Sequence, residues 1–499
     1  MAGGLKRLAK ETAIYGVGSI VGRFLNWMLV PMYTRILENT GEYGIVTNIY
    51  SIIALLMVLL TYGMETGFFR FIYKKEEQEP MRIYASTLYS VAFTSLLFFV
   101  GVMIFLQPVS GVLGYASHPE YIGMMTGVAA VDAFCCIPFA YLRYKNRPVR
   151  FLTVKLLNIG LNIGLNIFFL VLCPEINTYH PEWISWFYRP DYGAGYIFIS
   201  NIFTSALTFA MLIPEMMSGF RAKFNLQRLR NMLRYSFPML ILGIAGILNQ
   251  TADKILFPFL FDDKDYANSQ LGIYGACFKI AVVMVMFIQA FRYAYEPFVF
   301  SKNKDGNHKN AYAVAMKYFI IFSLIIFIGV IFYLDLLKHF VEKEYYPGLT
   351  VVPIVMLGEL FFGIYYNLSA WYKLTDKTQW GAWFSITGCI VTVVIIVGYV
   401  PYYGFIACAW ASFASNLLMM LLSYFVGQKK FPVKYDLRSA FTYVVIAAIC
   451  YVAGMMPQID SIFLRLTYRT VIFAVFIGIV IKKDLPLAEI PYVGKYFRK

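Results

Sequence analysis

Several charged residues lie inside segments that are otherwise apolar, and these are the first candidates for chemistry. Arg23 falls near the middle of the first apolar segment, where Thr12, Tyr15, Ser19, Arg23 and Asn26 recur every three or four residues. This spacing places them on one face of a helix. A charge at the centre of a bilayer costs at least about 2.5 kcal/mol, so a charge that persists there marks a cavity, a partner or a transport pathway.

Further charges lie in the apolar segments 236–260 and 271–295. Asp253 and Lys254 are adjacent, so their side chains diverge by about 100° around a helix, and we expect that they do not simply neutralise each other. Lys279 lies about 12 Å below the predicted outer end of its helix. Arg292 lies near the inner end, four residues before Glu296, and this spacing predicts an intrahelical ion pair.

The residue types define what these positions could do. Arginine and lysine form charge-assisted hydrogen bonds with phosphate oxygens, whereas the single acids Asp132 and Glu359, like Asp253, are candidates for coupling to protons or sodium or for gating. Segment 151–172 adds regularly spaced asparagines and glycines, which are Asn158, Asn162, Asn166, Gly160 and Gly164. Such residues bind sugar hydroxyls or join helices by hydrogen bonds and close packing, and the sequence leaves both alternatives open.

The composition requires lipid as the solvent for the elements that carry these residues. The chain of 499 residues is 60% hydrophobic and 14% charged, with a mean hydropathy of +0.63. Since a helix needs roughly 20 apolar residues to cross a bilayer, we predict an all-α membrane protein of about fourteen transmembrane helices. The predicted spans are 12–33, 44–64, 84–106, 122–142, 151–172, 193–214, 236–260, 271–295, 312–334, 350–372, 379–399, 404–426, 438–456 and 465–481.

The loops between these spans predict the orientation. About three quarters of the 43 basic residues fall at the two ends and in alternate loops, and cytoplasmic loops collect lysine and arginine. Both termini are therefore expected in the cytoplasm, and the net charge of +15 needs no nucleic acid as partner. The longest external loop, 173–192, is rich in tryptophan and tyrosine, which favours an interfacial aromatic belt over sugar stacking.

An internal repeat suggests how the helices are grouped. Segment 25–53 resembles segment 252–281, with the Tyr43-Gly44 step aligned on Tyr274-Gly275. Duplicated halves are common in transporters. We therefore predict a six-helix bundle in 1–220, a second one in 221–430, and two additional helices with a short tail in 431–499.

Two helix pairs carry a family resemblance. The runs VPMYTRILENTGEYG (30–44), YSFPML (235–240), ADKILF (252–257), GIYGACFKIA (272–281) and YEPF (295–298) resemble the polysaccharide-transport family. These are flippases for O-antigen and capsule precursors within the multidrug, oligosaccharidyl-lipid and polysaccharide exporter superfamily. The positions that match the family pattern are Arg35, Gly44, Pro238, Asp253, Tyr274, Lys279 and Pro297.

The resemblance implies a flippase of the bacterial inner membrane. The cargo would be an oligosaccharide on undecaprenyl diphosphate, moved from the cytoplasmic to the outer leaflet by alternating access between two bundles. The expected partners are this lipid-linked oligosaccharide, the bilayer, and the polysaccharide polymerase and chain-length machinery; no cofactor, metal or catalysis is expected. The residues expected to bind the diphosphate or sugar are Arg23, Asn26, Lys254, Lys279 and Arg292, and those expected to couple or gate are Asp132, Asp253 and Glu359.

Three other functions remain as alternatives. A multidrug exporter of the same superfamily, or a flippase for lipid II or a teichoic-type precursor, would share the fold. A membrane glycosyltransferase would also handle lipid-linked sugars, but it is disfavoured because the sequence has no sizeable soluble segment.

Overall fold

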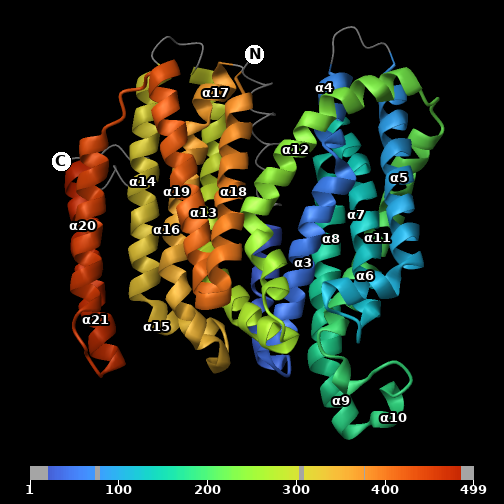
Figure 1. Cartoon of the computed structure of the whole chain (residues 1–499), viewed down its shortest axis with the longest axis horizontal. Helices are drawn as coiled ribbons and strands as arrows, with labels where there is room; N and C mark the ends of the chain where they lie inside the picture. The colour runs from blue at the N-terminus through green and yellow to red at the C-terminus, as the bar shows by residue number, and fades with distance from the viewer. Residues whose placement is uncertain (1–20, 74–78, 303–307, 376, 485–499) are drawn as a thin grey trace. The chain divides into compact units, whose positions relative to one another are not determined.

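The computed structural model describes residues 21–73, 79–302, 308–375 and 377–484. This part of the chain is helical and contains no strand. Thirteen of its helices are long and apolar enough to cross a membrane, and each overlaps one of the last thirteen predicted spans (Figure 1). The all-α, multi-pass membrane fold is therefore confirmed.

The chain divides into two compact units. The first unit contains the described residues up to Ala276 together with Ser385–Ala411, and the second contains Cys277–Phe384 together with the described residues from Ser412 onward. The bundle boundaries near residues 220 and 430 were predicted from a sequence repeat, which these two units do not test, so they stay a prediction.

The first unit is built mainly from helices of the N-terminal half. Its helices are α2 (Val30–Ile36), α3 (Thr40–Thr61), α4 (Met64–Ile72), α5 (Pro80–Ile104), α6 (Leu106–Leu113), α7 (Pro119–Tyr144), α8 (Pro148–Ile167), α9 (Cys173–Tyr179), α10 (Pro181–Ile184), α11 (Gly195–Phe220) and α12 (Leu226–Leu256). Short turns η1 (Phe168–Leu172), η2 (Pro190–Tyr192) and η3 (Phe257–Leu260) join them.

The second unit contains most of the C-terminal helices. They are α14 (His308–Phe332), α15 (Leu334–Leu337), α16 (Val351–Leu368), α17 (Ala370–Leu374), α20 (Leu437–Met455) and α21 (Ile462–Asp484), with turns η4 (Lys338–Phe340) and η5 (Lys343–Thr350). Three helices contribute residues to both units, namely α13 (Lys264–Lys302), α18 (Gln379–Tyr403) and α19 (Phe405–Lys430).

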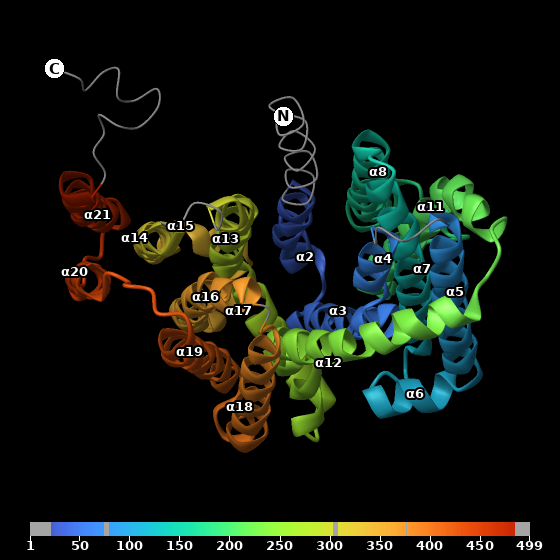
Figure 2. The same ribbon diagram turned by 90° about the horizontal axis from the view of Figure 1, so that it is seen from above.

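Helix α7 forms the centre of the first unit. It packs against α5, α11, α3 and α8, which surround it in Figure 2. Buried apolar side chains such as Tyr84 and Ile137 fill the space between these helices, and the rings of Tyr84 and Tyr141 stack with centroids 4.1 Å apart. Since lipid surrounds such helices, this close packing replaces the hydrophobic effect as the force that holds them together.

Two glycines allow α3 and the start of α13 to cross at backbone contact within the first unit. A Cβ atom on Gly44 would lie 1.8 Å from the carbonyl oxygen of Asn268, and one on Gly272 would lie 1.8 Å from that of Thr40. The contact is reciprocal, because Thr40 precedes Gly44 by one turn just as Asn268 precedes Gly272. Only glycine fits at either position, which gives a structural reason for the glycine of the Tyr43-Gly44 step.

The additional C-terminal helices α20 and α21 pack against α14 in the second unit (Figure 2). At one end Arg469, which is 6% exposed, forms an ion pair of 2.9 Å with Asp335 and donates to the carbonyl oxygens of Gly454 and Phe332. At the other end Asp484 accepts from Lys317 and from Tyr443. These partly buried pairs join the two helices to the rest of the unit.

The structure differs from the predicted spans at helix ends. Helix α12 begins at Leu226, well before the predicted residue 236, and the side chain of Asn225 caps it by accepting from the backbone N–H of Arg228. Hydropathy marks only the part of a helix that lies in hydrocarbon, so it misses polar turns that continue beyond the membrane.

The first predicted span is interrupted in its described part. Residues 21–27 are helical, the chain leaves the helix at Met28-Leu29, and α2 starts at Val30 with Pro31 in its first turn. Proline lacks a backbone N–H and so favours the start of a helix over its interior. Residues 12–20 of this span lie outside the described residues.

Candidate functional site

An ion pair buried in the first unit forms a polar cluster with a tyrosine. In the last turn of α12, the ammonium of Lys254 lies 2.7 Å from Oδ2 of Asp253, and the hydroxyl of Tyr274 donates to the same oxygen at 2.6 Å. Asp253 is 5% exposed and Lys254 is 8% exposed. The ammonium also lies 5.3 Å from the centre of the Tyr274 ring.

The expectation that Asp253 and Lys254 do not neutralise each other was therefore wrong. The angle between adjacent Cα–Cβ bonds predicts divergent side chains, but the long stem of lysine folds back so that its ammonium reaches the carboxylate of the preceding residue. Burial makes this contact favourable, because an isolated charge would carry a large desolvation cost.

Two residues that the sequence did not single out support this pair. Asn48 on α3 donates to the carbonyl oxygen of Lys254 at 2.7 Å, and the hydroxyl of Tyr115 donates to Oδ1 of Asn48 at 2.7 Å. Tyr115 lies in the loop between α6 and α7, where burial raises the pKa of its hydroxyl above the ordinary value of 10.0. It therefore stays protonated and keeps its role as donor. The chain of hydrogen bonds links α12, α13, α3 and this loop.

The arrangement keeps the two charges together, because the Asp253 carboxylate holds the Lys254 ammonium at 2.7 Å. A charged pair inside a membrane helix marks a position where a substrate or an ion can be bound.

Asp132 lies elsewhere in the first unit. This half-buried side chain on α7 accepts a hydrogen bond of 2.8 Å from the hydroxyl of Ser205 on α11. No ion pair joins it to a described basic residue, so it is not part of the Asp253 cluster.

Arg23 and Asn26 are exposed on the helical segment 21–27. Within the described part of the chain neither side chain makes a hydrogen bond or an ion pair. Thr12, Tyr15 and Ser19, the other members of the predicted stripe, lie outside the described residues.

In the second unit the structure brings a second cation to Arg292. The guanidinium of Arg292 lies 4.0 Å from the centre of the Tyr366 ring, and the ammonium of Lys373 lies 4.4 Å from the same centre and donates to the Tyr366 hydroxyl at 3.3 Å. One aromatic ring therefore holds two cations, since its face carries partial negative charge. Neither Tyr366 nor Lys373 has a spacing in the sequence that would have revealed this.

The remaining predicted residues of the second unit are Lys279 on α13 and Glu359 on α16. Both are half-buried. The side chain of Glu296 lies outside the described residues, so its pairing with Arg292 stays a prediction.

The asparagines of α8 bind neighbouring helices. Asn158 donates to the carbonyl oxygen of Thr204 and to the Thr208 hydroxyl, Asn162 donates to Asn201, and Asn166 accepts from Tyr33. The structure thus favours interhelical hydrogen bonding over sugar binding for these side chains. A Cβ on Gly160 or Gly164 would meet no atom of the described residues within 4 Å, so no close glycine packing is found among them.

We compared the chain with known proteins. No protein-family model and no curated protein sequence matches it. Among solved structures, it superposes on "Lipid II flippase MurJ, inward closed conformation" with a TM-score of 0.70 and 15% identity, covering 95% of this chain and 99% of MurJ. An inward-facing multidrug resistance MATE family transporter of the MOP superfamily matches with a TM-score of 0.61 and 11% identity, over 82% of this chain and 94% of that one. The MATE multidrug transporter DinF-BH, in a complex with a small molecule, matches with a TM-score of 0.60 and 15% identity, over 87% and 96%.

The chain has the fold of MurJ and the MATE transporters. The fold that the sequence resemblance implies is thereby confirmed. The share of this chain that is matched differs between MurJ and the MATE transporters. MurJ matches 95% of this chain, whereas the two MATE structures match 82% and 87% of it, although nearly the whole length of each MATE structure is matched. This chain and MurJ therefore share additional structure beyond the fold common to all three.

Proposed function

We propose that this protein is a flippase for undecaprenyl-diphosphate-linked oligosaccharide, such as an O-antigen, capsule or exopolysaccharide repeat unit, in the bacterial inner membrane. The observation that carries the proposal is the near-complete match to the lipid II flippase fold, 95% of this chain and 99% of MurJ, against 82% and 87% of this chain for the two MATE structures. The sequence motifs of the polysaccharide-transport family then favour an oligosaccharide as the cargo.

The physical task explains why such a protein needs polar groups in its helices. A sugar head group carries many hydroxyls, and each one transferred to hydrocarbon without a hydrogen bond costs several kcal/mol, roughly 2–7. A polar route must replace water during the crossing, while the lipid tail stays in the bilayer. The proposed activity is transport by alternating access, without covalent chemistry.

Each unit offers cations for the diphosphate. Arg23 is exposed, with no hydrogen-bonding or ion-pairing partner among the described residues of the first unit. In the second unit Arg292 and Lys373 are ordered on Tyr366, and Lys279 completes the proposed set together with Asn26. Lys254 belongs to the set as well, but its ammonium is held by Asp253, so binding the diphosphate there requires a phosphate oxygen to replace that carboxylate.

Two energy sources fit this assignment. The membrane potential favours outward movement of negative charge by about 2.3 kcal/mol per charge per 100 mV. Alternatively, proton or sodium exchange at Asp253, Asp132 or Glu359 drives the cycle. Dissipating the potential while keeping the ion gradients distinguishes the two sources.

A deletion strain tests the proposed cargo. We expect loss of a surface polysaccharide and accumulation of its lipid-linked repeat unit in the cytoplasmic leaflet, with unchanged sensitivity to a cationic rhodamine dye. Unchanged polysaccharide together with raised dye sensitivity would instead indicate a drug exporter like the MATE neighbours. Arrested cell-wall synthesis with accumulated lipid II would indicate the cargo named for MurJ.

Arg23 provides the matching test of the binding site. We expect that Arg23→Ala lowers polysaccharide export, whereas Arg221→Ala, which removes another exposed cation from the loop after α11, leaves it unchanged. Full export in the Arg23 variant would remove this residue from the mechanism.

A further inference from the structure

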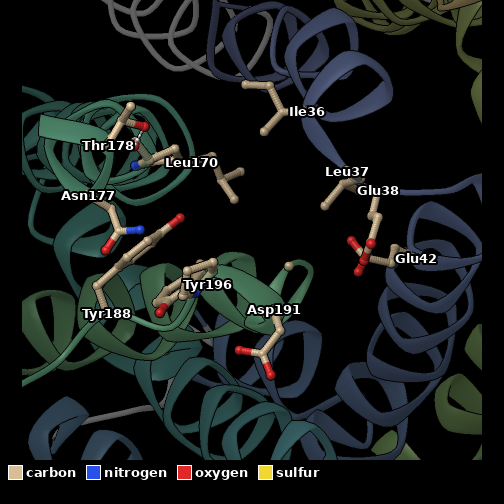
Figure 3. Close-up of a pocket in the computed structure, with 13 residues that line it drawn as sticks. Ile36, Leu37, Glu38, Glu42, Leu170, Asn177, Thr178, Tyr188, Asp191 and Tyr196 are labelled. Carbon is tan, nitrogen blue, oxygen red and sulfur yellow. Dashed lines mark hydrogen bonds between the residues drawn. The ribbon is translucent and has the colours of Figure 1, made fainter. Parts of the chain in front are cut away.

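A pocket of about 610 Å³ opens in the first unit between the α2–α3 connection and the segment from α8 to α11. Its polar lining comes from Glu38 and Glu42 on one side and from Asn177, Tyr188 and Asp191 on the other (Figure 3). Helices α9 and α10 project beyond α6 at the same end of the unit (Figure 1). This is the end that the distribution of basic residues places outside the cell.

The external segment 173–192 separates its aromatic residues into two groups. Trp183 and Trp186 are exposed, the latter at 82%, which suits the predicted interfacial belt. Tyr188, by contrast, is buried and lines the pocket. The sequence alone could not separate these groups, because both lie within a few residues of each other.

The aromatic wall of the pocket is held in place. Tyr188 stacks on Tyr196 with ring centroids 5.2 Å apart, and Tyr196 stacks on Phe169 at 5.0 Å. The Tyr196 hydroxyl accepts from the backbone N–H of Arg189 at 2.6 Å and donates to the carbonyl oxygen of Arg189 at 3.1 Å. Burial raises the pKa of Tyr188 to about 12, so its hydroxyl remains a neutral donor at physiological pH.

The opposite wall is brought close by a glycine. Gly193 has a φ of +38°, and a Cβ there would lie 2.3 Å from a carboxylate oxygen of Glu42. Glycine tolerates this conformation and this approach, so the loop after η2 packs directly on Glu42. At the start of α3, Asn39 accepts from the backbone N–H of Glu42 at 3.1 Å and fixes the position from which this side chain extends.

The charge of the pocket selects against the diphosphate. Glu38, Glu42 and Asp191 contribute acidic groups, and the described residues of the lining include no lysine or arginine. Acidic oxygens accept hydrogen bonds from hydroxyl groups, and the amide of Asn177 and the hydroxyl of Tyr188 provide donors. The Thr178 hydroxyl donates to the carbonyl oxygen of Pro174, so it offers an acceptor. The volume lies within the range typical of small-molecule sites, about 300–1,000 Å³, and is far larger than a single ion requires.

We propose that this pocket binds the uncharged, hydroxyl-rich sugar portion of the cargo at the outer end of its passage. The inference rests on the proposed flippase function and adds a second site with a different preference. Cations bind the diphosphate within the helices, whereas the acidic pocket receives sugar hydroxyls and repels phosphate. Sugar and diphosphate are thereby held at different positions during release.

Binding of free sugars to the purified full-length protein in lipid nanodiscs tests the proposal. The probes are glucose, galactose and N-acetylglucosamine, with glucuronate as the anionic comparison, and saturation-transfer NMR reports their affinity. We expect at least one neutral sugar to bind, glucuronate to bind more weakly, and Asn177→Ala and Asp191→Asn each to weaken binding by up to about tenfold through loss of hydrogen bonds.

The control variant is Glu182→Gln. It removes an exposed acid of α10 that does not line the pocket, so we expect unchanged affinity, and all three variants should retain the wild-type melting temperature. No binding by any neutral sugar, affinity insensitive to the two pocket substitutions, or stronger binding of glucuronate would overturn the proposal. Saturable sodium binding that displaces the sugar and is lost in Asp191→Asn would replace it with a cation site.

The two proposals fail in different ways. Translocation of the lipid-linked oligosaccharide without sugar binding at the pocket would leave the flippase function standing and remove this site. Sugar binding without any translocation would support the sugar site in the pocket but refute the proposed flippase function.

Discussion

Replacing Asp253 with asparagine should destabilise the protein, because it leaves the buried Lys254 ammonium without an opposite charge. The substitution keeps the size of the side chain and leaves an acceptor for the Tyr274 hydroxyl, but it removes the charge that lies 2.7 Å from the Lys254 ammonium. Lys254 is only 8% exposed. Removing one partner of a buried ion pair costs about 3–5 kcal/mol, and we expect a loss of this size.

A second substitution separates this cause from general damage. In Asp253→Asn combined with Lys254→Met, no charge is left unpaired and the apolar stem of residue 254 is retained, so most of the lost stability should return. The apparent melting temperature in detergent, followed by intrinsic fluorescence at one scan rate, gives the comparison. Asp262→Asn serves as the control, because it removes an exposed acid from the loop before α13.

Two results would refute the reasoning. If Asp253→Asn melts with the wild type, the pair contributes no net stability. If the double variant is no more stable than the single one, an unpaired lysine is not the cause of the loss.

Three further predictions concern contacts elsewhere in the protein. Gly44→Ala should lower the melting temperature and yield because its Cβ would collide with a backbone oxygen, whereas Gly160→Ala, whose Cβ would meet no described atom within 4 Å, should have little effect. Asp335→Asn should cost about 3–5 kcal/mol by leaving buried Arg469 without its anion, and should increase protease cleavage around α20 and α21. Tyr366→Leu should reduce export without changing the melting temperature, while Tyr366→Phe, which retains the ring beneath the cations, should export normally.

Much of the fold could be predicted because the bilayer imposes a simple constraint. Every crossing needs a long apolar helix, so hydropathy located the thirteen spans found in the described residues. Breaks within a helix and polar extensions of a helix depend on single residues, and a mean hydropathy over a window of residues does not detect them. Pro31 starts a new helix within the first predicted span, and Asn225 extends α12 into a polar segment.

The candidate site was predicted less completely. Charge in an apolar segment directed attention to Asp253 and Lys254, but the contact between their side chains depends on the flexible lysine stem. Asn48 bonds to Lys254, which is 206 residues away along the chain. Tyr115 in turn bonds to Asn48, which is 67 residues away. Such contacts are set by helix packing, which a single sequence does not report.

The contact at Gly44 shows which part of the internal repeat the sequence predicted and which part it did not. The sequence comparison aligned Gly44 with Gly275, whereas in the structure Gly44 crosses α13 at Gly272, nearly one helical turn earlier. Similar residues near the start of two helices were recognisable, but the register of their contact was not.

Reconstitution of the purified protein in sealed vesicles tests the central claim most directly. The vesicles carry a fluorescent oligosaccharide on a polyprenyl diphosphate, and a membrane-impermeant quencher reports how much label moves between leaflets. We predict translocation of this substrate that is strongly reduced by Arg23→Ala and is not inhibited by a cationic rhodamine dye. Vesicles that transport the dye but leave the lipid-linked oligosaccharide in its original leaflet would contradict the account.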